Sequence, residues 1–202
     1  LPSVAAHCGL LGFSTSKLEW GSSYGIPFDI GMWEGVDGNA LVATINPGQY
    51  AFPLEEDDLA NDPLWQERID KTGGECGAYV GFKYFGLGDT GGAPDEDSVK
   101  KLEEAIKANG RLHISSAPAD QLSKELTEEE KAKLPRHKNE FLLIEHGVGT
   151  YTSHSAMKRW NRKNEQIADA AEKAAVVADW LGAARYPTEK LHDAWVRFLA
   201  NQ

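Results

Sequence analysis

The first third of the chain has short apolar runs separated by turn-forming residues. Two runs, Phe28–Trp33 and Ala40–Ile45, are rich in β-branched and aromatic residues, which is typical of strands. Asp37-Gly38 lies between them, and this pair readily adopts the positive φ angles that a tight hairpin needs. The pattern predicts a β-hairpin in this region.

The middle of the chain alternates between strand-like and helix-like segments. Helical periodicity is expected over residues 55–72, with Leu64, Trp65 and Ile69 as the apolar stripe. Three further strands are expected at Tyr79–Phe85, Arg111–Ser115 and Glu140–His146. Between the strands, Asp97 or Ser98 is expected to cap a helix that runs to about Ala108, and another helical segment is expected to begin at Ala119–Lys124. The charged run Glu128–Pro135 is expected to be exposed. Strands that alternate with helices favour an α/β fold with a parallel sheet or a β/α barrel.

From Ser155 onward the pattern is helical only. Apolar residues recur every three or four positions up to Gly182, and Tyr186-Pro187-Thr188 ends this helix and begins another. Two amphipathic helices cannot cover their own apolar faces. We therefore expect an α/β part over residues 1–153 and the beginning of a helical bundle over residues 154–202.

Composition limits the possible classes of protein. The chain has 202 residues, of which 41% are hydrophobic and 26% are charged, which suffices for one folded domain with part of another. No apolar run approaches the ~18 residues of a membrane span. Residues 1–13 are apolar but lack a basic segment, so we expect neither a signal peptide nor a membrane partner, and we expect the chain to be part of a longer protein. Two cysteines in 202 residues leave the redox compartment of the chain open.

Charge is distributed unevenly between the two halves. Residues 1–97 contain 16 acidic and 4 basic residues, whereas residues 98–202 contain 15 acidic and 17 basic ones. This distribution provides no basic surface for nucleic acid, so nucleic acid is not an expected partner. The two cysteines, Cys8 and Cys76, neither form a disulfide framework nor have zinc-ligand spacing, and we expect both to be small buried residues.

Two residues at the ends of expected strands are candidates for chemistry. His146 ends the most apolar strand and precedes a loop of small and hydroxyl residues, and in β/α barrels the carboxyl ends of strands face the active site. Asp89 lies in the glycine-rich loop GLGDTGGAP, whose glycines let the backbone approach a ligand closely. The alternatives are a histidine packed at the core edge and an ordinary tight turn.

A third candidate is the aromatic and acidic segment that contains Trp33 and Glu34. An aromatic ring beside a carboxylate suits a sugar, whose ring stacks on the aromatic face and whose hydroxyl groups form hydrogen bonds. A hairpin with a packed tryptophan would explain the same pattern.

Three blocks of the sequence resemble the α-mannosidases of glycoside hydrolase family 38, bacterial branch. They are GFSTSKLEWGSSYGIPFDIGMWEGVDGNALVATINPGQY, GLGDTGGAPDEDSV and HGVGTYTSHSAMKRWNRKNE, and the resemblance extends over essentially the whole chain in order. It implies part of a seven-stranded β/α barrel followed by helices of a three-helix bundle. It also implies a zinc-dependent, retaining, exo-acting hydrolysis of terminal α-mannosides, with two carboxylates as nucleophile and acid/base.

The resemblance also assigns roles to single residues. His146 matches a zinc-binding histidine and Asp89 best matches the acid/base aspartate, with Asp95 and Asp97 as alternatives; Trp33, Glu34 and Tyr151 are implied at the substrate site. The nucleophilic aspartate and an His-x-Asp pair, which together provide the other three zinc ligands in the family, have no counterpart in residues 1–202.

Two functions from different classes follow from this partial match. The first is a fragment of an α-mannosidase that is inactive alone, retains little or no zinc, and in its intact form acts on mannose-containing glycans, with a homo-oligomer possible. The second is a non-catalytic carbohydrate-binding or structural module. Hydrolysis of an aryl α-mannoside distinguishes the two.

Overall fold

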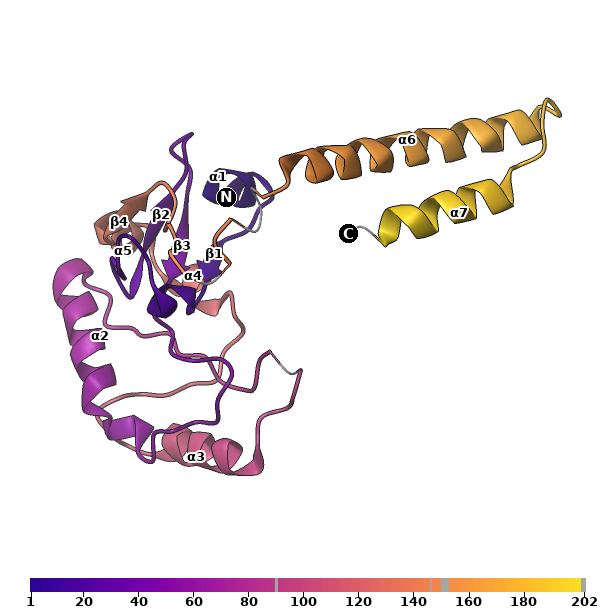
Figure 1. The fold of residues 1–202 in the computed structure, drawn as a ribbon. Helices are drawn as coiled ribbons and strands as arrows, with labels where there is room; N and C mark the ends of the chain where they lie inside the picture. Colours follow the sequence, from indigo (N-terminus) through magenta and orange to yellow (C-terminus); the bar gives the residue numbers. More distant parts are fainter. Residues whose placement is uncertain (90, 146, 150–152, 201–202) are drawn as a thin grey trace. The chain divides into compact units, whose positions relative to one another are not determined.

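The computed structural model of the chain describes residues 1–89, 91–145, 147–149 and 153–200 (Figure 1). These residues form a mixed α/β structure that divides into two compact units, Leu1–Val148 and Gly149–Gln202. The described elements, in chain order, are α1 (Pro2–His7), β1 (Gly12–Ser14), the 3-10 helix η1 (Lys17–Trp20), β2 (Ile30–Glu34), β3 (Ala40–Thr44), the 3-10 helix η2 (Leu59–Asn61), α2 (Pro63–Cys76), α3 (Glu96–Lys107), α4 (Gln121–Glu125), α5 (Glu128–Lys133), β4 (Arg136–Lys138), α6 (Ser155–Trp180) and α7 (Thr188–Leu199).

The first unit is built on a four-stranded sheet with the order β1-β3-β2-β4. Strands β2 and β3 form the expected hairpin, in which Ile30 pairs with Thr44 and Glu34 pairs with Ala40. Gly38 has a φ angle of 84° in the connecting turn, as the Asp-Gly pair predicts. Strand β1 is parallel to β3 and β4 is parallel to β2, so the sheet is mixed.

The hairpin is buried on both faces, and its alternating side chains enter two different clusters. Ile30 and Met32 pack with Val42 on one face, where α2 contributes Cys76 and α4 contributes Leu122. Trp33 and Ala43 lie in the cluster on the other face. Near-continuous apolar runs are what a strand covered on both sides requires.

Helix α2 begins later than the predicted helix over residues 55–72. The Asp62 carboxylate accepts a hydrogen bond of 2.9 Å from the backbone N–H of Trp65, and Pro63 occupies the first turn, where its missing N–H costs nothing. These two residues fix the beginning of the helix. Trp65 is buried as expected, but Leu64 is 59% exposed because it lies on the solvent side.

Three expected strands are not strands in the structure. Residues 79–85 and 111–115 lack ladder pairing within the part of the chain that the structure describes, and Tyr79 is 67% exposed. In residues 140–145, Leu143 forms an isolated bridge with Ser22. Apolar composition alone does not make a strand, because the backbone also needs a partner for its hydrogen bonds. The short strands β1 and β4 and the helix α1 were not expected.

The second unit consists of the two helices that the sequence predicts. Helix α6 runs from Ser155 to Trp180 and α7 from Thr188 to Leu199, and no strand occurs in residues 153–200. The indole Nε1 of Trp195 donates a hydrogen bond of 2.7 Å to Glu172, which joins the two helices. Most of their apolar residues remain exposed, including Trp160 and Ile167. No helix in the described ranges is both long and apolar enough to cross a membrane.

The expectation for the cysteines is half right. Cys76 is buried and its thiol donates to the backbone oxygen of Thr72, whereas Cys8 is exposed after the end of α1. A small apolar side chain tolerates both environments.

Candidate functional site

Asp89 lies exposed in the glycine-rich loop between residues 86 and 94, with a positive φ of 59°. Aspartate tolerates this left-handed conformation better than most residues. One carboxylate oxygen, Oδ1, accepts a hydrogen bond of 3.3 Å from the hydroxyl of Tyr50. The carboxyl group is thus accessible to solvent and tied to a neighbouring segment at one oxygen.

The loop lies directly against Tyr50. The backbone N–H of Gly88 donates a hydrogen bond of 2.5 Å to the backbone oxygen of Tyr50. A Cβ atom at Gly88 would stand 2.4 Å from the Tyr50 ring, which is closer than any real Cβ contact. Glycine is therefore required at this position for packing against the tyrosine.

Lysine and aromatic side chains surround the Tyr50 hydroxyl. The Lys17 ammonium of η1 donates a hydrogen bond to this hydroxyl and lies 3.8 Å from the ring centre of Trp20. Tyr84 packs edge-on against Tyr50 at 6.3 Å between ring centres, and its own hydroxyl accepts a hydrogen bond from Ser14. Burial is the main cause that raises the pKa of the Tyr84 phenol. Side chains from three separate segments, at residues 14–20, 50 and 84, therefore meet beside the loop of Asp89.

The two alternative carboxyl groups have structural partners. Asp95 caps the N-terminus of α3, where it accepts hydrogen bonds from the backbone N–H of Ser98 at 2.9 Å and from the Ser98 hydroxyl at 2.6 Å. These hydrogen bonds lower the pKa of the Asp95 carboxyl. Asp97 lies in the first turn of α3, 3.7 Å from the Lys101 ammonium. Of the three acids, Asp89 is the one that projects from the loop itself.

Trp33 lies in the core and is 3% exposed. The centre of its ring lies 4.5 Å from that of Phe141 and 4.8 Å from that of Phe13. Its Nε1–H donates a hydrogen bond of 2.7 Å to the backbone oxygen of Asn139. The indole joins β2 to two segments distant in sequence. Its predicted contact with a sugar is not tested by this arrangement and stays a prediction.

Glu34 ends β2 and binds two cations of β4. The carboxylate lies 3.0 Å from the Lys138 ammonium and 3.3 Å from the Arg136 guanidinium. The hydrogen bond from Lys138 is the largest cause that lowers the pKa of the Glu34 carboxyl. In this structure the side chain fastens the sheet edge, and its predicted role at a substrate site also stays a prediction.

The predicted zinc ligand His146 and the predicted site residue Tyr151 lie outside the described residues. Among residues 1–89, 91–145, 147–149 and 153–200, no three His, Cys, Asp or Glu side chains form a group that could hold a metal ion. A catalytic zinc site needs about three protein ligands. The described residues therefore do not fit a zinc site on their own.

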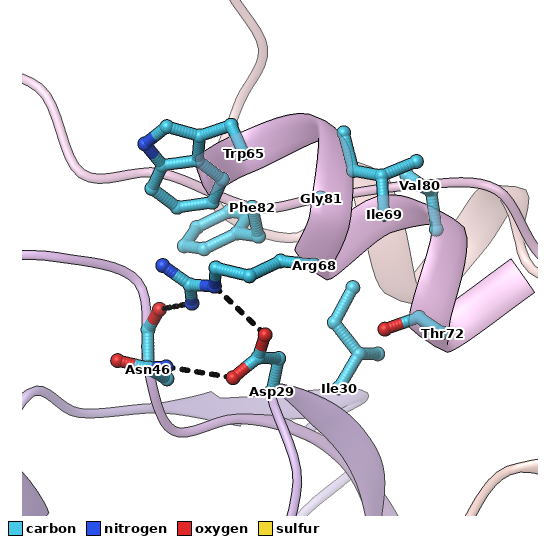
Figure 2. Close-up of a pocket in the computed structure, with 10 residues that line it drawn as sticks. All are labelled: Asp29, Ile30, Asn46, Trp65, Arg68, Ile69, Thr72, Val80, Gly81 and Phe82. Carbon is cyan, nitrogen blue, oxygen red and sulfur yellow. Dashed lines mark hydrogen bonds and ion pairs between the residues drawn. The ribbon is translucent and has the colours of Figure 1, made fainter. Parts of the chain in front are cut away.

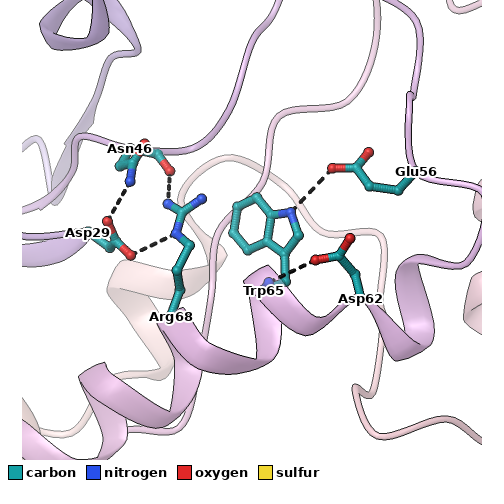
Figure 3. Close-up of polar contacts among 6 residues, drawn as sticks. All are labelled: Asp29, Asn46, Glu56, Asp62, Trp65 and Arg68. Carbon is teal, nitrogen blue, oxygen red and sulfur yellow. Dashed lines mark hydrogen bonds and ion pairs between the residues drawn. The ribbon is translucent and has the colours of Figure 1, made fainter.

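A second polar cluster lies between the sheet and α2 (Figures 2 and 3). The Arg68 guanidinium binds the Asp29 carboxylate at 2.7 Å and the backbone oxygen of Asn46, and the Asn46 amide donates to Asp29 at 2.7 Å. Arg68 also lies 4.1 Å from the ring centre of Trp65, whose Nε1–H donates to Glu56 at 3.3 Å. The contacts among Arg68, Asp29 and Asn46 therefore fasten α2 to the segments that flank the β2–β3 hairpin.

The cavities of the first unit differ greatly in size. The cavity beside Arg68 holds about 10 Å³, which is space for about one water molecule and none for a sugar (Figure 2). A larger groove of about 760 Å³ lies between residues 79–85 and 111–117, and the side chains of Tyr79, Phe82 and His113 are among those that line it. The two segments expected to be strands therefore flank an open groove.

Sequence reasoning missed Lys17 and Tyr50. Neither has a local motif of its own, because their contact joins positions 33 residues apart. The available signal was their membership of the Gly12–Tyr50 block that carries the family resemblance.

Comparison with known proteins supports the resemblance on two grounds. The family model described as "Alpha mannosidase middle domain" matches residues 147–202. Alpha-mannosidase 2C1 of Mus musculus is 29% identical over 208 residues, and that of Homo sapiens is 28% identical over 204 residues; each alignment covers all of this chain and 19% of the relative. Alpha-mannosidase G of Dictyostelium discoideum is 30% identical over 173 residues, covering 85% of this chain and 15% of that protein.

These relatives test the family resemblance and show how much of a related protein the chain corresponds to. The recognition of the α-mannosidases of glycoside hydrolase family 38 is confirmed, whereas the bacterial branch stays a prediction. The chain spans about a fifth of the length of the curated relatives it matches.

Proposed function

We propose that this chain, which is related along its whole length to the α-mannosidases of glycoside hydrolase family 38, is the part of such an enzyme that carries its general acid/base. The intact protein would hydrolyse terminal α-mannosides of glycans with retention of configuration, using zinc. This chain alone would be inactive, because the nucleophilic aspartate and three zinc ligands have no counterpart in residues 1–202.

One observation carries this proposal: the exposed carboxyl group of Asp89 beside Tyr50. A retaining glycosidase needs a carboxylic acid that protonates the leaving oxygen and then, as a carboxylate, removes a proton from water. Such a group must be accessible to the substrate and held in a fixed position. Asp89 has that accessibility, whereas Asp95 is used as a helix cap.

The remaining assignments belong to the same proposal. Residues 1–153 would complete part of a seven-stranded β/α barrel, with the groove beside residues 79–85 filled by strands of the longer protein. Residues 154–202 would begin a three-helix bundle. His146 would be one of the four zinc ligands. Trp33 and Glu34 would lie at the sugar, and Tyr151 would lie at the substrate site near the metal. In the intact enzyme, zinc would bind and orient hydroxyl groups of mannose.

The substitution Asp89→Asn in the longer protein tests the assignment. Asparagine tolerates the positive φ of position 89, so the fold should be unchanged. Turnover should fall by roughly 10²–10⁴, the range expected for loss of a general acid. The fall should be largest for alkyl mannosides, whose leaving group needs protonation, and smallest for activated aryl mannosides. Azide should accelerate the second step, in which the same carboxylate acts as a base.

Asp97→Asn is the matched control, since Asp97 lies eight positions away in the first turn of α3. It should leave the dependence on the leaving group as in the unsubstituted protein. If Asp97→Asn or Asp95→Asn showed the leaving-group dependence and Asp89→Asn did not, the assignment of Asp89 would be wrong.

A further inference from the structure

Three side chains form a continuous hydrogen-bonded row that ends at Asp89. The Lys17 ammonium donates to the Tyr50 hydroxyl, and the Tyr50 hydroxyl donates to Asp89 Oδ1 over 3.3 Å. An ammonium group has donors only, and a phenol has a single proton. Lys17 therefore occupies the acceptor side of the hydroxyl, and the phenolic proton is directed at the carboxylate.

Tyr50 has further contacts besides its hydrogen bond to the Asp89 carboxylate. Its backbone oxygen accepts the hydrogen bond from Gly88, and Tyr84 lies edge-on against its ring with an interplanar angle of 83°. Lys17 is itself fixed over the ring of Trp20. A side chain that several contacts already hold in one rotamer can orient its neighbour without a further loss of conformational entropy.

We propose that Tyr50, oriented by Lys17, is a positioning residue for the Asp89 carboxyl group. This inference rests on the proposed function of Asp89. The Tyr50 hydroxyl engages Oδ1, so Oδ2 would be the oxygen that exchanges a proton with the substrate. The backbone contact between Gly88 and Tyr50 fixes the loop at the same time, so the tyrosine controls both the place and the rotation of the carboxyl group.

The row also suits both stages of the proposed reaction. When Asp89 is a carboxylate, the proton of Tyr50 stabilises Oδ1, and a hydrogen bond to an ionised acceptor is stronger than one between neutral groups. When the carboxyl is protonated on Oδ2, Oδ1 still accepts from Tyr50. One orientation of the tyrosine therefore serves the acid and the base stage.

The test uses Tyr50→Phe in the longer protein, which keeps the ring, its contact with Tyr84 and the backbone acceptor for Gly88. We expect kcat for alkyl mannosides to fall roughly tenfold, the effect of about one hydrogen bond, with little change in KM. Activated aryl mannosides should be affected less, as for Asp89→Asn. Lys17→Met should cause a smaller fall of the same kind, and Lys17→Arg, which keeps a donor, should restore part of it.

Tyr84→Phe is the matched control, because this neighbouring phenol is bonded to Ser14 and not to Asp89. Tyr84→Phe should change kcat for alkyl and for activated aryl mannosides by the same factor. A structural role for Tyr50 would lower the thermal midpoint of unfolding without separating the two substrate classes.

The double variant Tyr50→Phe with Asp89→Asn separates failure of this inference from failure of the proposed function. If Tyr50 acts through Asp89, removal of its hydroxyl should have no further effect once Asp89 is replaced. An equal effect of Tyr50→Phe in both backgrounds, or none in either, would overturn the positioning role alone. If Asp89→Asn itself showed no leaving-group dependence, both the proposed function and this inference would fall.

Discussion

At the scale of single residues, Trp33 joins three segments of the first unit in its core. It is 3% exposed and contacts Phe13, Phe141 and the backbone of Asn139. Trp33→Ala should reduce the free energy of unfolding by roughly 3–5 kcal/mol, because it leaves a cavity and an unpaired carbonyl. Urea denaturation followed by circular dichroism measures this change. Trp33→Phe, which keeps an aromatic ring, should cost clearly less; equal losses would show that the ring packing contributes little.

The sequence was sufficient to predict some of the candidate site residues but not their contacts. Asp89 could be selected because flanking glycines and a preceding apolar segment are visible in the sequence. Its partners Tyr50 and Lys17 could not, because their contacts depend on how three distant segments meet. The cap of α3 was expected at Asp97 or Ser98, but Asp95 provides it. Several acids in succession make the register of a cap ambiguous.

At the scale of elements, Glu34 joins β2 to β4 through Lys138 and Arg136. Because the hydrogen bond from Lys138 lowers the pKa of this carboxyl below its ordinary value of 4.5, the pair stabilises the fold above that pH. The contribution is lost as pH falls through the lowered pKa. We expect Glu34→Gln to lower the urea midpoint at about pH 7 and to differ much less from the unsubstituted chain at about pH 3. Glu67→Gln, on the exposed side of α2, is the control; a difference for Glu34→Gln that is the same at both pH values would contradict the pairing.

Elements with strong local signals were predicted well, and those that need a distant partner were not. The β2–β3 hairpin and the two long helices α6 and α7 follow from Asp-Gly turn chemistry and helical periodicity. Residues 79–85 and 111–115 have the composition of buried strands but lack ladder partners in the described part of the chain. Strand pairing is non-local, so no pattern within a segment can establish it.

At the scale of the whole molecule, the apolar surface of the second unit provides a test of the proposed helical bundle. Ile167 is 62% exposed on α6. In a Cys8→Ser background, Ile167→Cys should react rapidly with a maleimide in this chain and slowly in the longer protein, where a third helix would cover it. Lys173→Cys, on the polar side of α6 next to Asp169, should react in both. Equal reactivity of Ile167→Cys in the two proteins would contradict the bundle.

We have proposed that this chain is an essential but insufficient part of an α-mannosidase. Hydrolysis of an aryl α-mannoside by this chain and by the longer protein, measured side by side, tests it most directly. We predict turnover by the longer protein and none by this chain, because the nucleophile and three zinc ligands that the family resemblance implies have no counterpart in residues 1–202. Turnover by this chain alone, or mannoside binding without turnover by the longer protein, would contradict the account; the second result would favour a carbohydrate-binding module.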